Sequence, residues 1–349
     1  IAQFAKSLGA QQDYVNYIRR AQSYKNLFNL RTGFMRPRKN GNWVSPFDPR
    51  EVNNNFTEAN SWQYSFYMPQ DIEGYIKLMG GNKKFENKLD SLFIAPEKTT
   101  GREQGDITGL IGQYAHGNEP SHHIIYLYDY TSTPAKAQQL VHKVMTEMYK
   151  NDPDGLIGNE DCGQMSAWYV LSALGFYPVT PGANNYMIGT PAFSLVEIHL
   201  ENGKSFTINS PGVNDKNFYV QNAILSTSAH LPPHNWDSSF IHHEDIANGG
   251  LITFMMGDKP TAFGAGKYKS TGISMQDANN TFVINPVIHG GPVPFKNKKT
   301  VTITSPQKEV TVYYSTDGSV PQPTGKKYTR PIIIDSNMVL KAIAIDKKG

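Results

Sequence analysis

The sequence has a single cysteine, Cys162, so no disulfide can form within the chain. No apolar run approaches the roughly 18 residues that a membrane-spanning helix needs, which excludes a span in this sequence. The formal net charge is only +3 and basic residues are not clustered, which argues against nucleic acid as a partner. A phosphate-binding loop and a His-Glu-x-x-His zinc motif are both missing. These absences leave a globular protein that binds neither nucleic acid nor zinc through a known motif.

The period of the apolar residues changes along the chain. In the first half it is helical, and we expect helices over 13–28, 60–81 with an interruption at Pro69, 82–93, 121–130, 134–150 and 164–174. After about residue 185 apolar and polar residues alternate as in strands. Residues 286–297 are rich in Gly, Pro and Lys and predict a linker, and 298–349 predict a small β-sandwich. The fold class expected is α+β, with more than one domain.

Three polar islands interrupt the helical half, each at the start of an apolar helix. They are "TEANSWQY" with Glu58, "HGNEPSHH" with Glu119, and "GNEDCGQMSAW" with Asp161. Because the ends of neighbouring helices in an array converge, three carboxylates in this position favour glycoside hydrolysis, which needs an acid and a second carboxylate. Trp62 and Trp168 offer rings that stack on sugars. The alternative is that these polar residues only cap helices.

Metal binding is a further alternative for the same islands. Glu119 and His122 have the Glu-x-x-His spacing of half a di-iron site, but the sequence holds no second copy. Adjacent His122 and His123 would point to different faces of a helix, which disfavours zinc. Calcium fits better, since Asn118, Glu119, Asp161 and Gln164 offer the oxygen ligands that this ion prefers.

The islands also carry a family resemblance. "HGNEPSHH", "GNEDCGQMSAWYVLSALGFYPVTPG" and "TEANSWQY", with "IGTPAF" and "GGLITFMMGDKP" later, closely resemble glycoside hydrolase family 92, the calcium-dependent exo-acting α-mannosidases. The likeness covers about residues 1–265 and implies part of an (α/α)6 barrel within a catalytic portion over 1–285. It also implies an upstream β-sandwich and the rest of the barrel, neither of which is in this sequence.

The resemblance implies roles for individual residues. By the family pattern, Glu58 is the general acid and Asp161 the general base of an inverting hydrolysis, in which the two carboxyl groups lie about 6.5 to 9.5 Å apart. Asn118 and Glu119 are the expected calcium ligands. The expected substrate-binding residues are Trp62, His116, Glu119, His122, His123 and Gln164.

The segment 298–349 resembles the small C-terminal β-domain of chitobiases and hexosaminidases, through "VYYSTDGSVP", "YTRPIII" and "VLKAIAIDKKG". Together the two likenesses imply an exported bacterial enzyme, periplasmic or at the cell surface, that removes terminal mannose from glycans. The expected linkage is α-1,2. Two rival hypotheses are a carbohydrate-binding protein without turnover and a calcium-free (α/α)6 glucosidase.

Overall fold

The computed structural model describes residues 1–227, 230–268, 282–291 and 294–347. The chain divides into unit 1, made of Ile1–Pro49 with Asp277–Gly349, and unit 2, made of Arg50–Gln276. The two units differ in charge. Unit 1 has 18 Lys and Arg against seven Asp and Glu, a formal charge of +11, whereas unit 2 has 15 against 23, a formal charge of −8. The small net charge of the whole chain therefore conceals two strongly charged parts.

Unit 1 begins with a helical segment that is shorter than expected. It contains α1 (Ala2–Ser7), α2 (Gln11–Arg20) and the 3-10 turn η1 (Ser23–Asn26). Tyr14 and Ile18 are buried as the period predicts, but the α-helix ends at Arg20 and Leu27 is 46% exposed. Two tight hairpins follow, formed by β1 (Phe28–Asn29), β2 (Phe34–Met35), β3 (Arg38–Lys39) and β4 (Asn42–Trp43).

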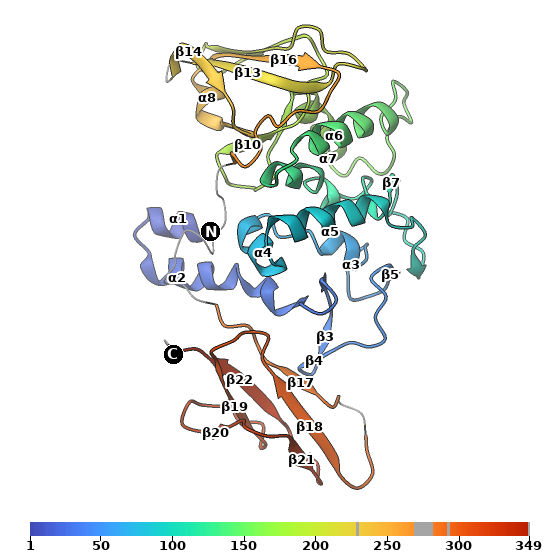
Figure 1. The fold of residues 1–349 in the computed structure, drawn as a ribbon, viewed down its shortest axis with the longest axis vertical. Coiled ribbons are helices and arrows are strands. Elements are labelled where there is room, and N and C mark those ends of the chain that lie inside the picture. The colour runs from blue at the N-terminus through green and yellow to red at the C-terminus, as the bar shows by residue number, and fades with distance from the viewer. Residues whose placement is uncertain (228–229, 269–281, 292–293, 348–349) are drawn as a thin grey trace. The chain divides into compact units, whose positions relative to one another are not determined.

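The C-terminal part of unit 1 consists of two three-stranded sheets, which Figure 1 shows in orange and red. Their strands are β17 (Val287–His289), β18 (Lys299–Thr304), β19 (Thr311–Ser315), β20 (Lys326–Lys327), β21 (Ile332–Ile334) and β22 (Lys341–Ile345). The sheet orders are β17-β18-β21 and β20-β19-β22. Strand β17 lies inside the segment expected to be a linker, because its alternating Val287, Ile288 and His289 pair with β18.

The helical part of unit 2 follows the sequence closely. Its α-helices are α3 (Ser61–Tyr64), α4 (Ile72–Met79), α5 (Asn82–Ile94), α6 (Ala135–Glu147) and α7 (Gln164–Leu174). Gly80 and Gly175 end α4 and α7 in the left-handed conformation (φ 100° and 99°), which glycine adopts without steric cost. Two short pairings, β5 (Glu51–Val52) with β6 (Thr100–Gly101) and β7 (Leu110–Ile111) with β8 (Tyr114–Ala115), join the loops between the helices.

The expected helix over 121–130 is not an α-helix. It consists of the 3-10 helices η2 (Glu119–Ser121) and η3 (Ile125–Tyr130), with a turn between them. Every residue of η3 is buried, so this segment runs through the core rather than along its surface. Bulky side chains packed on all sides explain why the amphipathic periodicity of the neighbouring helices is missing here.

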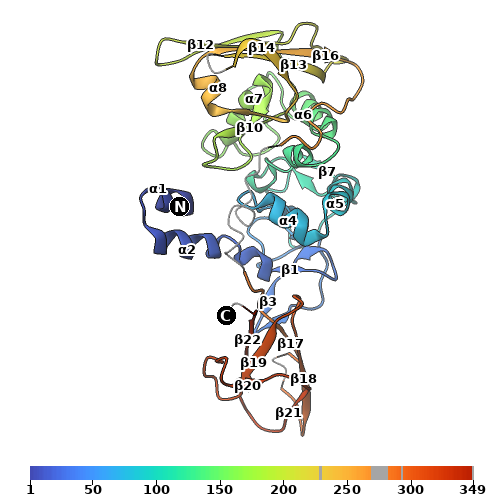
Figure 2. The ribbon, with the colours of Figure 1, turned by 60° about the vertical axis from the view of Figure 1, so that its left-hand side comes forward.

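A five-stranded sheet covers the other side of unit 2, with α6 and α7 lying under one of its faces (Figure 2). Its order is β11 (Leu195–His199), β12 (Ser205–Asn209), β16 (Gly250–Gly257), β13 (Tyr219–Thr227) and β14 (His230–Trp236). A smaller sheet joins β15 (Phe240–His242), β10 (Asn185–Ile188) and β9 (Phe176–Tyr177), and α8 (His243–Ala247) follows β15. Leu171 and Leu174 of α7 pack against the apolar cluster that includes Phe206 and Phe254 of the sheet.

Unit 2 is therefore a mixed α and β structure. The sequence predicted part of an (α/α)6 barrel, and the helices in the described part of the chain do not confirm this architecture. Within the same residues no helix is long and apolar enough to cross a bilayer.

Candidate active site

The three polar islands meet in unit 2. The first and second islands are joined by a hydrogen bond of 3.1 Å, in which Asn118 Nδ2 donates to the backbone carbonyl of Glu58. The second and third approach through two glycines, since a Cβ atom added at Gly158 would lie 3.0 Å from the Cα of Gly117. A larger residue at Gly158 would press against Gly117, and one at Gly117 would collide with Thr108.

The carboxylates of the three islands interact. Burial raises the pKa of Glu119, and the neighbouring charges of Asp161 and Glu58 raise it further. A side-chain hydrogen bond between Glu119 and Asp161 also raises it, while a hydrogen bond from the backbone N–H of Glu119 itself acts in the opposite direction. Three acidic side chains from distant parts of the sequence therefore form one cluster.

Both expected catalytic residues have an unusual backbone conformation. Glu58 has a φ of 53°, Asp161 a φ of 51° and Cys162 a φ of 57°, all in the left-handed region. Non-glycine residues rarely adopt this conformation, and it costs free energy that the surrounding structure must supply. Such strain is concentrated at functional sites, which supports a role for these turns beyond connecting helices.

Helix capping is performed by other residues of the same islands. Asn60 caps α3 in a reciprocal capping box with Gln63. The carboxylate of Glu160 accepts hydrogen bonds from the backbone N–H of Ser166 (3.1 Å) and from its hydroxyl (2.9 Å) in the first turn of α7. Since these two side chains satisfy the helix ends, neither Glu58 nor Asp161 is needed as a cap.

His122 lies directly behind the carboxylates. Its Nε2 donates to the carbonyl of His116 (2.9 Å), so Nδ1 is the acceptor for the amide of Gln164 (3.1 Å). Burial lowers the pKa of His122 to about 4, although the charge of Asp161 opposes this shift. The imidazole is neutral near pH 7 and fixed in one tautomer.

His116 is held more deeply. Its Nδ1 bonds the hydroxyl of Tyr114 (2.8 Å) and its Nε2 bonds that of Tyr149 (2.7 Å). Tyr149 in turn donates to the carbonyl of Met165 (3.1 Å) in α7. Burial and the neighbouring His122 lower the pKa of His116 to about 2, so this ring is also neutral. His116 therefore lies in the core, with both ring nitrogens bonded to the protein.

The remaining expected residues are distributed between core and surface. His123 is 6% exposed and its Nε2 bonds the carbonyl of Phe66 (2.8 Å), so it lies in the core. Trp168 is fully buried and donates to the carbonyl of His122 (3.0 Å), so the expectation that it stacks on a sugar is wrong. Glu58 and Asp161 are exposed, and Trp62, Glu119 and Gln164 are partly exposed.

Sequence reasoning missed several residues that shape this region. Tyr114 and Tyr149 hold His116; Tyr114 is two residues from it and Tyr149 is 33 residues away, and no sequence pattern marks either tyrosine as its partner. Lys88 of α5 places its Nζ 4.4 Å from the centre of the Trp62 ring, and burial lowers the pKa of Lys88 to about 7. The sequence contains one sign that the second and third islands approach closely, which is the glycine that precedes the acidic residues of both.

Two models of known protein families match the sequence of this chain. A family model described as the glycosyl hydrolase family 92 catalytic domain matches residues 1–258. The chain belongs to glycosyl hydrolase family 92. A second model, the chitobiase/beta-hexosaminidase C-terminal domain, matches residues 291–349. Both resemblances predicted from the sequence are therefore confirmed.

Solved structures of family 92 members are similar to this chain. An α-mannosidase from Bacteroides thetaiotaomicron is 38% identical, with a TM-score of 0.68 over 76% of this chain and 34% of that one. The inverting mannosidase structure from the same organism is 36% identical, with a TM-score of 0.67 over 77% of this chain and 37% of that one. A secreted glycosidase of Arthroderma benhamiae is 28% identical over 286 residues, 74% of this chain and 34% of its own length. The chain thus spans about a third of these relatives.

The structure shows whether the expected ligands, Asn118 and Glu119, suit a calcium ion. Among the described residues no group of three or more His, Cys, Asp or Glu side chains is arranged to hold a metal ion. The local chemistry is nevertheless suitable. The Oδ1 of Asn118 has no hydrogen-bond partner in the described structure, because its bond to Glu58 uses Nδ2. Burial, and then the charges of Asp161 and Glu58, raise the pKa of Glu119, and a hard cation would relieve the repulsion among these carboxylates.

Proposed function

We propose that this chain is the C-terminal portion of an exo-acting inverting α-mannosidase that removes terminal mannose from glycans, with α-1,2 bonds as the expected substrate. The observation that carries the proposal is the convergence of Glu58, Glu119 and Asp161 on one exposed cluster. Membership of family 92 and the similarity to α-mannosidases, one of them in complex with mannoimidazole, support the substrate class.

In the proposed reaction Glu58 donates a proton to the oxygen of the leaving group as the bond from the anomeric carbon breaks. Asp161 takes a proton from a water molecule, which attacks the same carbon from the opposite face and inverts it. The backbone N–H of Gln164, which donates to the carbonyl of Asp161 (3.2 Å), fixes the turn that carries this base. Gln164 and Trp62, both partly exposed beside the carboxylates, are proposed to contact the sugar.

Calcium is proposed as the cofactor, with Asn118 and Glu119 as its protein ligands. When bound, the ion supplies positive charge that orients sugar hydroxyls and stabilises the transition state. Two ligands are fewer than the six to eight oxygens that calcium takes, so carbonyls, water and substrate would supply the rest. His122 holds the loop of Glu119 in place from behind, through its bonds to His116 and Gln164.

The domain organisation proposed with this function is a catalytic portion over 1–285, a linker and an accessory β-domain over 298–349. An (α/α)6 barrel and a β-sandwich would be completed by residues upstream in the whole enzyme. Export to the periplasm or cell surface also belongs to the proposal, and the similarity to a secreted glycosidase supports it.

The test is the release of mannose from α-1,2-mannobiose by this chain joined to its upstream residues. Proton NMR monitors the release and also reports the anomer that forms first. We expect β-mannose, loss of activity with a chelator, and rates reduced by about 10²–10⁴-fold in Glu58→Gln and Asp161→Asn. Asp152→Asn, a change of an exposed carboxylate in a loop outside the islands, is the matched control.

Three outcomes would contradict the proposal in different ways. Activity that survives in either variant removes that residue from its role. Release that is insensitive to chelation favours the calcium-free glycosidase. Binding of the disaccharide without any cleavage by the wild-type protein favours a carbohydrate-binding protein.

A further inference from the structure

Unit 1 contains a cavity that is separate from the carboxylate cluster of unit 2. Its volume is about 470 Å³, within the range of small-molecule sites, and it lies between the hairpins of residues 28–45 and strands β17 and β18. The residues that matter here are Asn29, Arg31, Arg36, Trp43 and His289, all of which line it.

The cavity wall offers hydrogen-bond donors that the protein does not use. Asn29 is 5% exposed, and its Oδ1 accepts from the backbone N–H of Arg31 (3.0 Å) and Thr32 (3.1 Å). Its Nδ2 has no partner in the described part of the chain. Arg36, 7% exposed, donates from Nε (3.0 Å) and Nη2 (2.6 Å) to the carbonyl of Val44, which leaves Nη1 unpaired within the same residues. Neither atom is among the fully buried polar atoms that lack a partner, so both donors are open to the cavity and can bond a ligand there.

The charge of the cavity points in the same direction. Arg31 is close enough to Arg36 that, after burial, its charge lowers the pKa of Arg36. The guanidinium of Arg31 has no ion pair among the described residues, and neither Asp nor Glu lines the cavity. Unit 1 as a whole carries a formal charge of +11. Two adjacent guanidinium groups without a counter-charge select an anion.

A rigid aromatic ring forms another part of the wall. Trp43 lines the cavity and is held by Arg38, whose guanidinium carbon lies 5.1 Å from the ring centre. Arg38 itself is fixed by bonds to the carbonyls of Gly41 (2.9 Å) and Pro286 (2.5 Å). An anchored indole ring beside polar side chains provides an apolar face of the kind on which the C–H face of a sugar packs.

We propose that this cavity binds an acidic sugar, a hexose that carries a carboxylate or a phosphate group. The ring of the sugar lies against Trp43, its anionic group accepts from Arg31 and Arg36, and Asn29 donates to a ring hydroxyl. This site does not depend on the hydrolytic function proposed for unit 2. It would hold the enzyme on an acidic glycan while the carboxylate cluster acts on another part.

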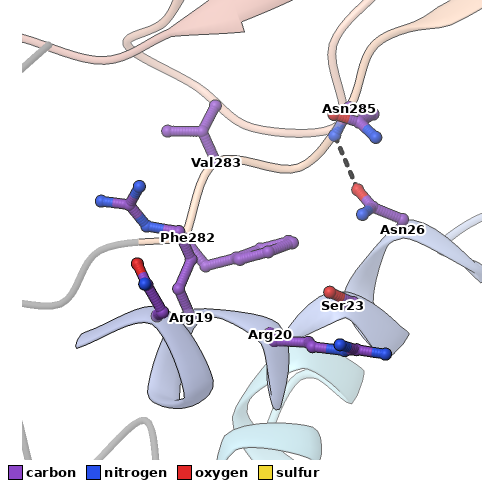
Figure 3. Close-up of a pocket in the computed structure, with 8 residues that line it drawn as sticks. Arg19, Arg20, Ser23, Asn26, Phe282, Val283 and Asn285 are labelled. Carbon is purple, nitrogen blue, oxygen red and sulfur yellow. Dashed lines mark hydrogen bonds between the residues drawn. The ribbon is translucent and has the colours of Figure 1, made fainter. Parts of the chain in front are cut away.

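A second pocket in unit 1 supplies the control. It has a volume of about 380 Å³, and Arg19 and Arg20 line it together with Phe282 and Asn285. Figure 3 shows that the side chains of Arg19 and Arg20 extend in different directions, so that one small anion cannot reach both. A hydrogen bond of 2.8 Å from the backbone N–H of Asn285 to Asn26 closes its edge. Removing Arg20 changes the charge of unit 1 as much as removing Arg31.

The experiment is calorimetric titration of the full chain at low salt with glucuronic acid, glucose 6-phosphate, glucose and inorganic phosphate. The gluco configuration avoids the site proposed for mannose. We expect at least one acidic sugar to bind at least tenfold more tightly than glucose and inorganic phosphate. Arg31→Ala should weaken this binding at least tenfold, Arg31→Lys should weaken it less, and Arg20→Ala should change it less than twofold. The preferred acidic sugar tells whether a carboxylate or a phosphate is recognised.

Several results would overturn the proposal. These are equal affinity for glucose, equal affinity for inorganic phosphate, no detectable binding of either acidic sugar, or the same loss in Arg20→Ala as in Arg31→Ala. Arg31 is exposed, so the variants should fold, and circular dichroism checks this. Trp43→Leu gives a second test, because it should weaken sugar binding while leaving the charge unchanged.

Discussion

The carboxyl group of Asp129 should make unit 2 less stable as the pH rises. Asp129 lies in the buried helix η3 and is fully buried, and neither of its carboxyl oxygens has a hydrogen-bond partner. The hydroxyl of Ser239 donates to its backbone carbonyl (3.1 Å) instead. Burial therefore raises the pKa of Asp129 well above its ordinary value, and the group stays protonated in the folded protein.

The sign and size of the effect follow from linkage. The unfolded chain loses this proton above a pH of about 3.9, while the folded chain keeps it. Ionisation therefore stabilises the unfolded state, and not the folded state, as the pH rises. The loss of stability is about 1.4 kcal/mol for each pH unit until the folded group also ionises. Between pH 5 and pH 7 it reaches about 2.7 kcal/mol, which for a unit of this size corresponds to roughly 5 to 11 °C in Tm.

Asp129→Asn removes the titration and keeps the shape of the side chain. We expect the variant to be close to the wild type in free energy of unfolding at pH 4 and more stable at pH 7. Urea denaturation at a series of pH values measures the difference, and other titrating groups cancel between the two proteins. A difference that does not change with pH would refute the reasoning, since it would mean that the carboxyl ionises normally in the fold.

The remaining predictions concern the surroundings of the carboxylate cluster. Gly158→Ala should reduce kcat of the whole enzyme and destabilise unit 2 by about 1–3 kcal/mol, because its Cβ would collide with Thr108 and Gly117; unchanged kcat would show that the islands need not approach closely. Trp168→Phe should destabilise unit 2, since the carbonyl of His122 loses its donor; thermal unfolding beside Val170→Ala, an exposed site on α7, tests this. Lys88→Met should gain stability relative to the wild type as the pH falls from 10 to 7 and no more below 7, because burial lowers the pKa of Lys88 to about 7; a constant difference in denaturation midpoints would contradict this.

The sequence predicted the elements whose pattern is local. Helices α5, α6 and α7 lie where the apolar period places them, and the glycines that end α4 and α7 were readable directly. The prediction of an α-helix over 121–130 was wrong, because a run that is buried on all sides has no amphipathic pattern. Strand β17 was taken as linker, because glycine, proline and lysine surround three residues that become a strand only by pairing with β18.

The site was partly predictable for a similar reason. The carboxylates of the three islands stand out as polar residues before apolar helices, and the structure brings them together. The environment of a histidine does not show in the sequence. His116 and His123 look like ligands in "HGNEPSHH", yet both are buried and bonded to the protein, through partners 33 and 57 residues away in the case of Tyr149 and Phe66. Only the tertiary structure distinguishes a histidine that holds a loop from one that faces a substrate.

The wide spacing of the carboxylates has a consequence for folding. More than a hundred residues separate Glu58 from Asp161, and each sits on a turn that is strained by itself. No proteolytic piece that lacks either end of this stretch can contain the cluster. Helical content of α4, α5 and α6 depends largely on local contacts and should return early in refolding, whereas contacts between distant segments form later. The turnover proposed for the cluster would then report completed folding, and it should recover after the circular dichroism signal.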